Sequence, residues 1–125
     1  MTTVTLNRNV PKRRAVAVVL WTLQIASAAL FLFSGTLKLT GAPMMVQMFG
    51  AIGLGQWFRY LTGGLEVISA VLLLVPSLAR FGALALAVTM VGAILTHLII
   101  IGGNPAVPIA LLAATTTIAW LRSRD

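Results

Sequence analysis

The stretch Ala15–Leu39, AVAVVLWTLQIASAALFLFSGTLKL, decides the fold class. It holds no charged residue before Lys38, and a bilayer is spanned by ~20 consecutive apolar residues in a helix. Arg13 and Arg14 precede it, as basic residues precede the apolar core of a secretory signal peptide. That core is only ~7–15 residues long, which is shorter than this stretch. We therefore predict that residues 15–39 form a retained transmembrane helix.

The composition of the whole chain points the same way. Of its 125 residues, 59% are apolar and 9% are charged, and the mean hydropathy is +1.02. A soluble domain carries about 25% charged residues, so this chain cannot build a surface that faces water on all sides. Its length suits one domain, and we predict an integral membrane protein.

Three more apolar segments follow the first, over residues 60–75, 81–101 and 105–121. Pro76 and the run Gly102–Pro105 separate them with residues that typically end or begin helices. The short connections make successive helices antiparallel neighbours. We predict an all-α fold, a membrane four-helix bundle.

The charges set the expected domain limits and topology. We predict a polar basic tail over residues 1–14, the transmembrane domain over 15–121, and a basic tail over 122–125. Seven of the nine basic residues then lie on one side of the membrane, against Lys38 and Arg59 on the other. Positive charge favours the cytoplasmic side, so both termini are expected to be cytoplasmic, with the protein in the inner membrane.

The same charges argue against some classes of function. The basic residues flank apolar runs and form no exposed basic face, so we expect no nucleic-acid partner despite the net charge of +7. The chain has no cysteine and one histidine. Thiol catalysis, iron–sulfur clusters and a bis-histidine haem within one subunit are thereby excluded, and no metal site is expected.

The segment 41–57, GAPMMVQMFGAIGLGQW, is apolar but too short to span the membrane. Met44, Met45, Met48, Phe49 and Ile52 recur at helical spacing within it. We predict an interfacial helix on the outer leaflet. Packing against lipid explains its apolar residues, and a flexible methionine lid is the alternative.

Three ionisable residues fall at similar depth in three different helices. Glu66 and His97 are both expected roughly 7–9 Å below the outer boundary, and the long side chain of Lys38 can reach the same level. A lone charge in a bilayer costs ~2.5–3.5 kcal/mol even on insertion scales. We therefore predict a shared polar site. The alternatives are an interfacial Lys38, a His97 bonded to a backbone carbonyl, and a purely structural Lys38–Glu66 bridge.

Small residues accompany these side chains. Ser34 and Gly35 precede Lys38, and Gly63 and Gly64 precede Glu66. Small residues allow membrane helices to approach closely, and they also leave space for a pocket. Gln24 and the hydroxyl side chains inside the spans are expected to join helices or to bond to their own helix.

Two stretches resemble a known family. The stretch LFLFSGTLKL (30–39) ends a helix with small-Gly-x-x-Lys, and LTGGLEVISAVLLLVPSLARFGALAL (61–86) has a glycine–glutamate pair followed by a short basic turn. Together they resemble the DoxX-like group of small four-helix membrane proteins, over roughly residues 30–97. The turn GLGQW (53–57) departs from the G-x-P that often precedes the second helix in that group.

The resemblance implies membrane redox chemistry. Some members resemble the small subunit of a thiosulfate:quinone oxidoreductase, and others accompany oxidoreductase or detoxification assemblies. The residues that match the pattern are Ser34, Gly35, Lys38, Gly64 and Glu66.

The first functional hypothesis is a redox-associated subunit that binds a quinone or another lipophilic small molecule near the outer leaflet. Lys38 and His97 would bond a carbonyl oxygen, and Glu66 would relay the proton. The sequence supplies no electron carrier of its own, so redox chemistry needs a bound cofactor or partner. Alone, the chain is not expected to be an enzyme. Its expected partners are membrane lipids, the lipophilic ligand, and either further copies of itself or a membrane complex.

Two other functions stay open. One is a small proton-coupled transporter, although small multidrug exporters carry their essential glutamate in the first helix and this chain does not. The other is a structural or assembly subunit without a ligand, in which the Lys38–Glu66 pair fixes helix register.

Overall fold

The computed structural model describes residues 10–124 of the chain, and this part is helical without any strand. The fold class predicted from the sequence, an all-helical bundle, is confirmed. The helices are α1 (Val10–Thr40), α2 (Pro43–Ile52), α3 (Gln56–Leu73), α4 (Ala79–Thr96), the short π-helix η1 (His97–Ile101) and α5 (Ala106–Ser123).

Three segments of the described chain are long and apolar enough to cross a membrane: Lys12–Thr40, Ala79–Ile101 and Ala106–Ser123. The remaining long helix, α3, has 18 residues and carries Arg59 and Glu66. Both of these charged side chains are buried. α3 thus places its charges inside the bundle, which is where a membrane helix can accommodate them.

The helices extend beyond their predicted ends. α1 begins at Val10, so residues 10–14 are helical, and α5 continues past residue 121 to Ser123. α3 begins at Gln56, four residues before the predicted start of its span. Apolarity defines only the part of a helix within lipid, and Lys and Arg are themselves good helix formers. The rest of the predicted N-terminal tail, residues 1–9, lies outside the described residues.

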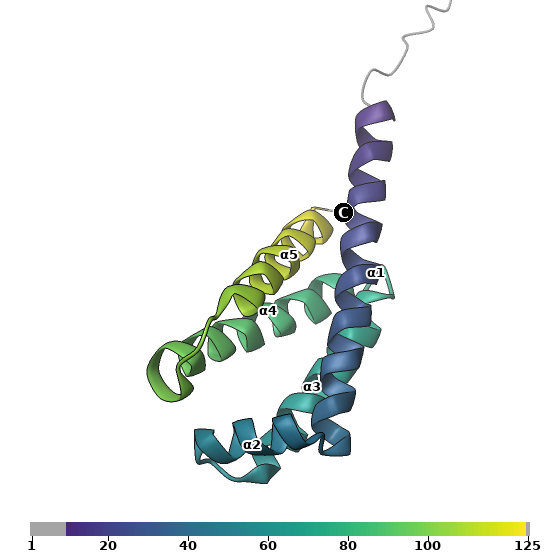
Figure 1. The fold of residues 1–125 in the computed structure, drawn as a ribbon. Helices are drawn as coiled ribbons and strands as arrows, with labels where there is room; N and C mark the ends of the chain where they lie inside the picture. The colour runs from purple at the N-terminus through teal and green to yellow at the C-terminus, as the bar shows by residue number, and fades with distance from the viewer. Residues whose placement is uncertain (1–9, 125) are drawn as a thin grey trace, which may run out of the picture.

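The bundle consists of two helix pairs (Figure 1). α3 runs beside the longest helix, α1, and α5 packs along α4. Contacts between α3 and α4 join the two pairs. α2 contacts α1, α3 and η1, so it crosses one end of the bundle, next to the C-terminal end of α1.

Glycines set the close approach of α1 and α3. A Cβ atom added to Gly35 would lie 2.8 Å from the carbonyl oxygen of Gly63, and one added to Gly63 would lie 3.0 Å from the carbonyl oxygen of Gly35. α3 and α4 meet in the same way, because a Cβ on Gly82 would lie 2.6 Å from the Ser69 carbonyl. Small residues therefore bring these helices together, as predicted.

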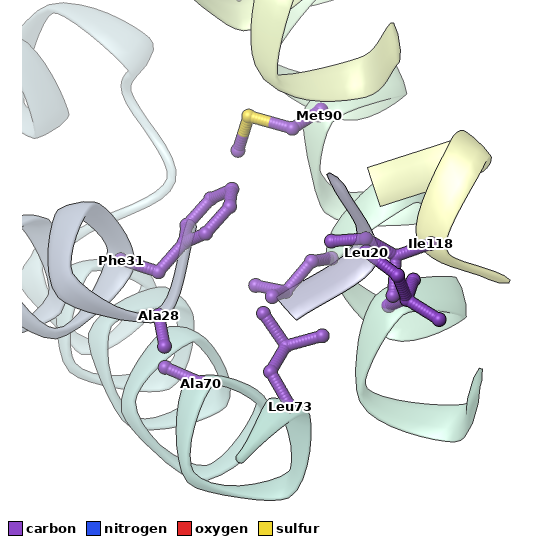
Figure 2. Packing of buried hydrophobic residues seen from close by; sticks show 9 residues of the cluster. Leu20, Ala28, Phe31, Ala70, Leu73, Met90 and Ile118 are labelled. Carbon is purple, nitrogen blue, oxygen red and sulfur yellow. The ribbon is translucent and has the colours of Figure 1, made fainter. Parts of the chain in front are cut away.

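Small and branched side chains interlock in the core (Figure 2). Ala28 of α1 faces Ala70 of α3, and Leu20, Leu73 and Ile118 meet where α1, α3 and α5 converge. All five are buried. These apolar contacts therefore hold α1, α3 and α5 together in the half of the bundle where α5 ends.

A buried amide joins three helices in that half. The Nε2 of Gln24 donates to the Leu73 carbonyl at 2.6 Å, and its Oε1 accepts from the Nε of Arg122 at 2.8 Å. This confirms that Gln24 links helices. Hydroxyl side chains bond to carbonyls of their own helix, as expected, at Thr89, Thr96, Thr115 and Thr117.

Candidate functional site

Lys38 and Glu66 form a buried ion pair between α1 and α3. The Nζ atom of Lys38 lies 3.1 Å from Oε1 of Glu66 and 3.2 Å from Oε2. It also donates to the hydroxyl of Ser34 at 2.7 Å, one helical turn back on α1. Lys38 is 9% exposed and Glu66 is 2% exposed. Lys38 therefore turns into the bundle and does not reach out to the membrane surface.

Arg59 caps the C-terminal end of α1, a role that was not predicted from the sequence. Its Nη1 donates to the main-chain carbonyl of Lys38, its Nε donates to Gln56 Oε1 at 2.8 Å, and its guanidinium lies 4.3 Å from the centre of the Tyr60 ring. The last carbonyls of a helix lack partners within it and favour a cation. A Cβ on Gly41, whose φ is +74°, would lie 3.3 Å from the Arg59 Nη1. A glycine at this turn therefore leaves room for the guanidinium of Arg59 beside the end of α1.

A cavity of about 630 Å³ opens beside the ion pair. Phe31 and Met90, which point toward one another in Figure 2, line it from α1 and α4. Its remaining lining is mostly apolar. The polar lining residues are Ser34, Lys38, Thr62, Glu66, Thr89, Thr96, His97 and Asn104.

The methionine-rich helix α2 covers this cavity. Met45, Met48, Phe49 and Ile52 line it, whereas Met44 is 70% exposed. Phe49 also packs on Phe58 of α3, with ring centres 5.8 Å apart. The apolar face of the predicted interfacial helix is therefore directed into the bundle, in the position that a lid would take.

His97 faces the same cavity from the first residue of η1. Its Nδ1 lies 2.9 Å from the carbonyl oxygen of Ala93. Because a carbonyl only accepts, Nδ1 carries a proton, and Nε2 is the acceptor of the ring in its neutral form. Within residues 10–124, His97 makes no hydrogen bond or ion pair with Lys38 or Glu66. The three side chains share a cavity and not a hydrogen-bond network.

The predicted glycines lie elsewhere. Gly35 packs against α3 at the helix crossing, and no atom lies within 4 Å of a Cβ added to Gly64. Neither glycine lines the cavity. Gly63, one residue earlier than Gly64, makes the close contact with α1. The predicted residues that the cavity brings together are Ser34, Lys38, Glu66 and His97.

Comparison with known proteins gives the family. A model described as the DoxX-like family matches residues 22–120. "Putative oxidoreductase CatD" of Bacillus subtilis (strain 168) is 31% identical over 74 residues, which are 59% of this chain and 55% of the relative. The chain thus spans about half the length of that relative. No solved structure matches it. Since the family match covers most of the chain and every polar residue of the cavity, this membrane protein belongs to the DoxX-like family.

Proposed function

We propose that the protein binds a lipophilic small molecule with a carbonyl or hydroxyl head group, such as a quinone, and acts as a redox-associated subunit in the inner membrane. One observation carries the proposal: a buried Lys38–Glu66 pair lines the wall of a largely apolar cavity of about 630 Å³. Ligand pockets of about 300–1,000 Å³ commonly combine apolar walls with a few fixed polar groups.

The polar groups suit both redox states of a quinone. The oxidised ring accepts hydrogen bonds at its carbonyl oxygens, and Lys38 and the hydroxyl of Ser34 are donors. The reduced ring donates from its hydroxyl groups, and the carboxylate of Glu66 and the neutral Nε2 of His97 are acceptors. Reduction of a quinone adds two electrons and two protons. Glu66 and His97 are groups that can pass those protons.

The electrons must come from elsewhere. The side chains at the cavity include no electron carrier, so we assign electron transfer to a bound cofactor or a partner subunit. The similarity to a relative named as an oxidoreductase favours this redox role. On this proposal the chain is an accessory component of an oxidoreductase complex, or a homo-oligomer that recruits one.

A second candidate function is supported by the position of the ion pair. A Cβ added to Gly63 would lie 2.8 Å from the Cβ of Lys38, so the pair lies directly at the closest crossing of α1 and α3. A buried ionic pair can specify which residues of two helices meet. In this case the pair would fix the register of an assembly subunit and would bind no ligand.

The test is mass spectrometry of the organic extract from protein purified in detergent. Wild type is compared with Glu66→Gln and with Gln24→Leu. Gln24 is also buried and polar, but it does not line the cavity. This control therefore disturbs a buried polar contact without altering the site.

We expect a quinone or another defined lipophile in wild type and in Gln24→Leu, and its depletion in Glu66→Gln. Matching extracts that hold only bulk lipid from all three proteins would contradict ligand binding and favour the register function. Equal depletion in both variants would mean that the ligand depends on overall stability and not on this site.

A further inference from the structure

A second cavity, of about 640 Å³, lies where α1 begins and α5 ends. It is separate from the quinone-type site, because the two share no lining residue. Residues from one face of α1 and from the C-terminal end of α5, including the residue after it, line the cavity. They are Lys12, Arg13, Val16, Ala17, Leu20, Trp21, Arg122 and Arg124.

Four of these eight residues are cations. Lys12 and Arg13 come from the first turns of α1, and Arg122 and Arg124 from the end of α5. Glu66, the one carboxylate side chain among residues 10–124, lines the other cavity. The lining of the second cavity is therefore strongly positive, and an anion is the ligand that it suits.

Contacts with neighbouring residues hold two of the cations in position. The Nε of Arg122 donates to the buried Gln24 at 2.8 Å, and its guanidinium lies 5.3 Å from the centre of the Trp21 ring. Arg124 lies 5.0 Å from the ring centre of Trp120. Planar guanidinium groups bind phosphate oxygens in pairs. The fixed positive charge of Arg122, beside the exposed guanidinium of Arg124, favours a phosphate group over a smaller or less charged anion.

The apolar part of the lining indicates what carries the phosphate. Val16, Leu20 and Trp21 form an apolar wall along α1, between Lys12 and Arg13 at its start and Arg122 beside Trp21. A soluble phosphate compound would make no apolar contact with this wall, whereas the acyl chains of a phospholipid would lie against it. Basic pockets between membrane helices bind anionic lipid head groups. We propose that this cavity is a specific site for the phosphate head group of an anionic phospholipid.

The test uses the full chain in detergent and native mass spectrometry. The probes are phosphatidylglycerol, phosphatidylcholine and inorganic phosphate. The test variant is R13Q/R124Q, and the control is R14Q/R80Q, which removes the same charge from residues outside the cavity. All four arginines are exposed, so neither variant should unfold. Size-exclusion chromatography checks this.

We expect phosphatidylglycerol to bind wild type and the control equally, and to bind R13Q/R124Q at least tenfold more weakly. Phosphatidylcholine should bind all three weakly. Equal losses in the two variants would show diffuse attraction to charge and would overturn the proposal. Inorganic phosphate binding as tightly as phosphatidylglycerol would overturn the lipid assignment in favour of a soluble phosphate compound.

Discussion

Arg59 donates a hydrogen bond to the main-chain carbonyl of Lys38, so one buried cation fixes the end of the helix that carries another. The two positive charges tolerate this proximity because each has an acceptor. Lys38 pairs with the carboxylate of Glu66, and Arg59 bonds to a helix C-terminus, which bears partial negative charge. Arg59 thereby places the ammonium group of Lys38 against the cavity without touching the ion pair.

Replacing Arg59 by methionine should lower stability. The change leaves the Lys38 carbonyl without its cationic donor, and hydrogen bonds to charged groups contribute about 1.5–3 kcal/mol. Thermal unfolding in detergent measures the loss. Arg80→Met is the control, because Arg80 also lies over the ring of the next residue, at 4.7 Å from Phe81, but is exposed. Equal losses in the two variants would show that Arg59 does not hold the helix end.

The two adjacent glycines of α3 should respond oppositely to alanine. Gly63→Ala puts a Cβ 2.8 Å from the Lys38 Cβ and 3.0 Å from the Gly35 carbonyl, so α1 and α3 must separate. Overpacking of this kind costs about 1–3 kcal/mol. Gly64→Ala meets no atom within 4 Å and should gain about 0.5–1 kcal/mol of helix stability. The same melting assay compares them. A Gly63→Ala protein as stable as wild type would refute the close crossing.

The ion pair should show strong coupling in a double-mutant cycle. Lys38→Met leaves the buried carboxylate of Glu66 without its cation, and breaking a buried pair costs about 3–5 kcal/mol. Glu66→Met should cost less, because Lys38 keeps its bond to Ser34. The double variant should recover most of the loss, since no buried charge is left unpaired.

Equilibrium unfolding of the four proteins of this cycle gives the coupling energy. Additive losses would show that the two charges do not stabilise each other. The double variant also separates the two candidate functions. If the pair only sets register, this variant should assemble incorrectly, whereas loss of a ligand site should remove the lipophile and leave assembly intact.

The sequence predicts that Lys38 and Glu66 belong to one polar site, because a membrane offers a charged side chain few environments. Lys38 and Glu66 had to be paired, exposed to water or neutralised, and equal depth on two helices made pairing the favoured outcome. The depth of a residue in the membrane does not determine which face of its helix points toward a neighbouring helix or toward the cavity. Hence the predicted Gly64 lies away from the cavity while Gly63 makes the contact.

Arg59 was the clearest signal that the sequence analysis passed over. It lies seven residues before Glu66, which is about two turns of helix, and so on the same face. The predicted span starts at residue 60, which places Arg59 at the membrane surface. Apolarity marks where lipid surrounds a helix and not where the helix begins, so the turn from Gln56 that carries Arg59 was missed.

His97 gives the sharpest test of the polar contacts of the proposed ligand. His97→Phe keeps a ring of similar size but removes Nε2, the acceptor that the neutral histidine presents. One hydrogen bond contributes about 0.5–1.5 kcal/mol, so affinity should fall about 2–10-fold. The probe is a short-chain ubiquinone analogue, titrated by quenching of tryptophan fluorescence. Thermal stability should change little, because the ring is only half-buried.

Thr96→Val is the matched control for this substitution. Thr96 lines the same cavity, but its hydroxyl already donates to the Gly92 carbonyl at 2.7 Å, so its loss should leave quinone affinity unchanged. Equal weakening in both variants would attribute the effect to packing around η1. If His97→Phe binds the quinone as tightly as wild type while Glu66→Gln binds it more weakly, the polar contacts of the quinone are restricted to Lys38 and Glu66. His97 would then have only the role of a side chain bonded to its own helix.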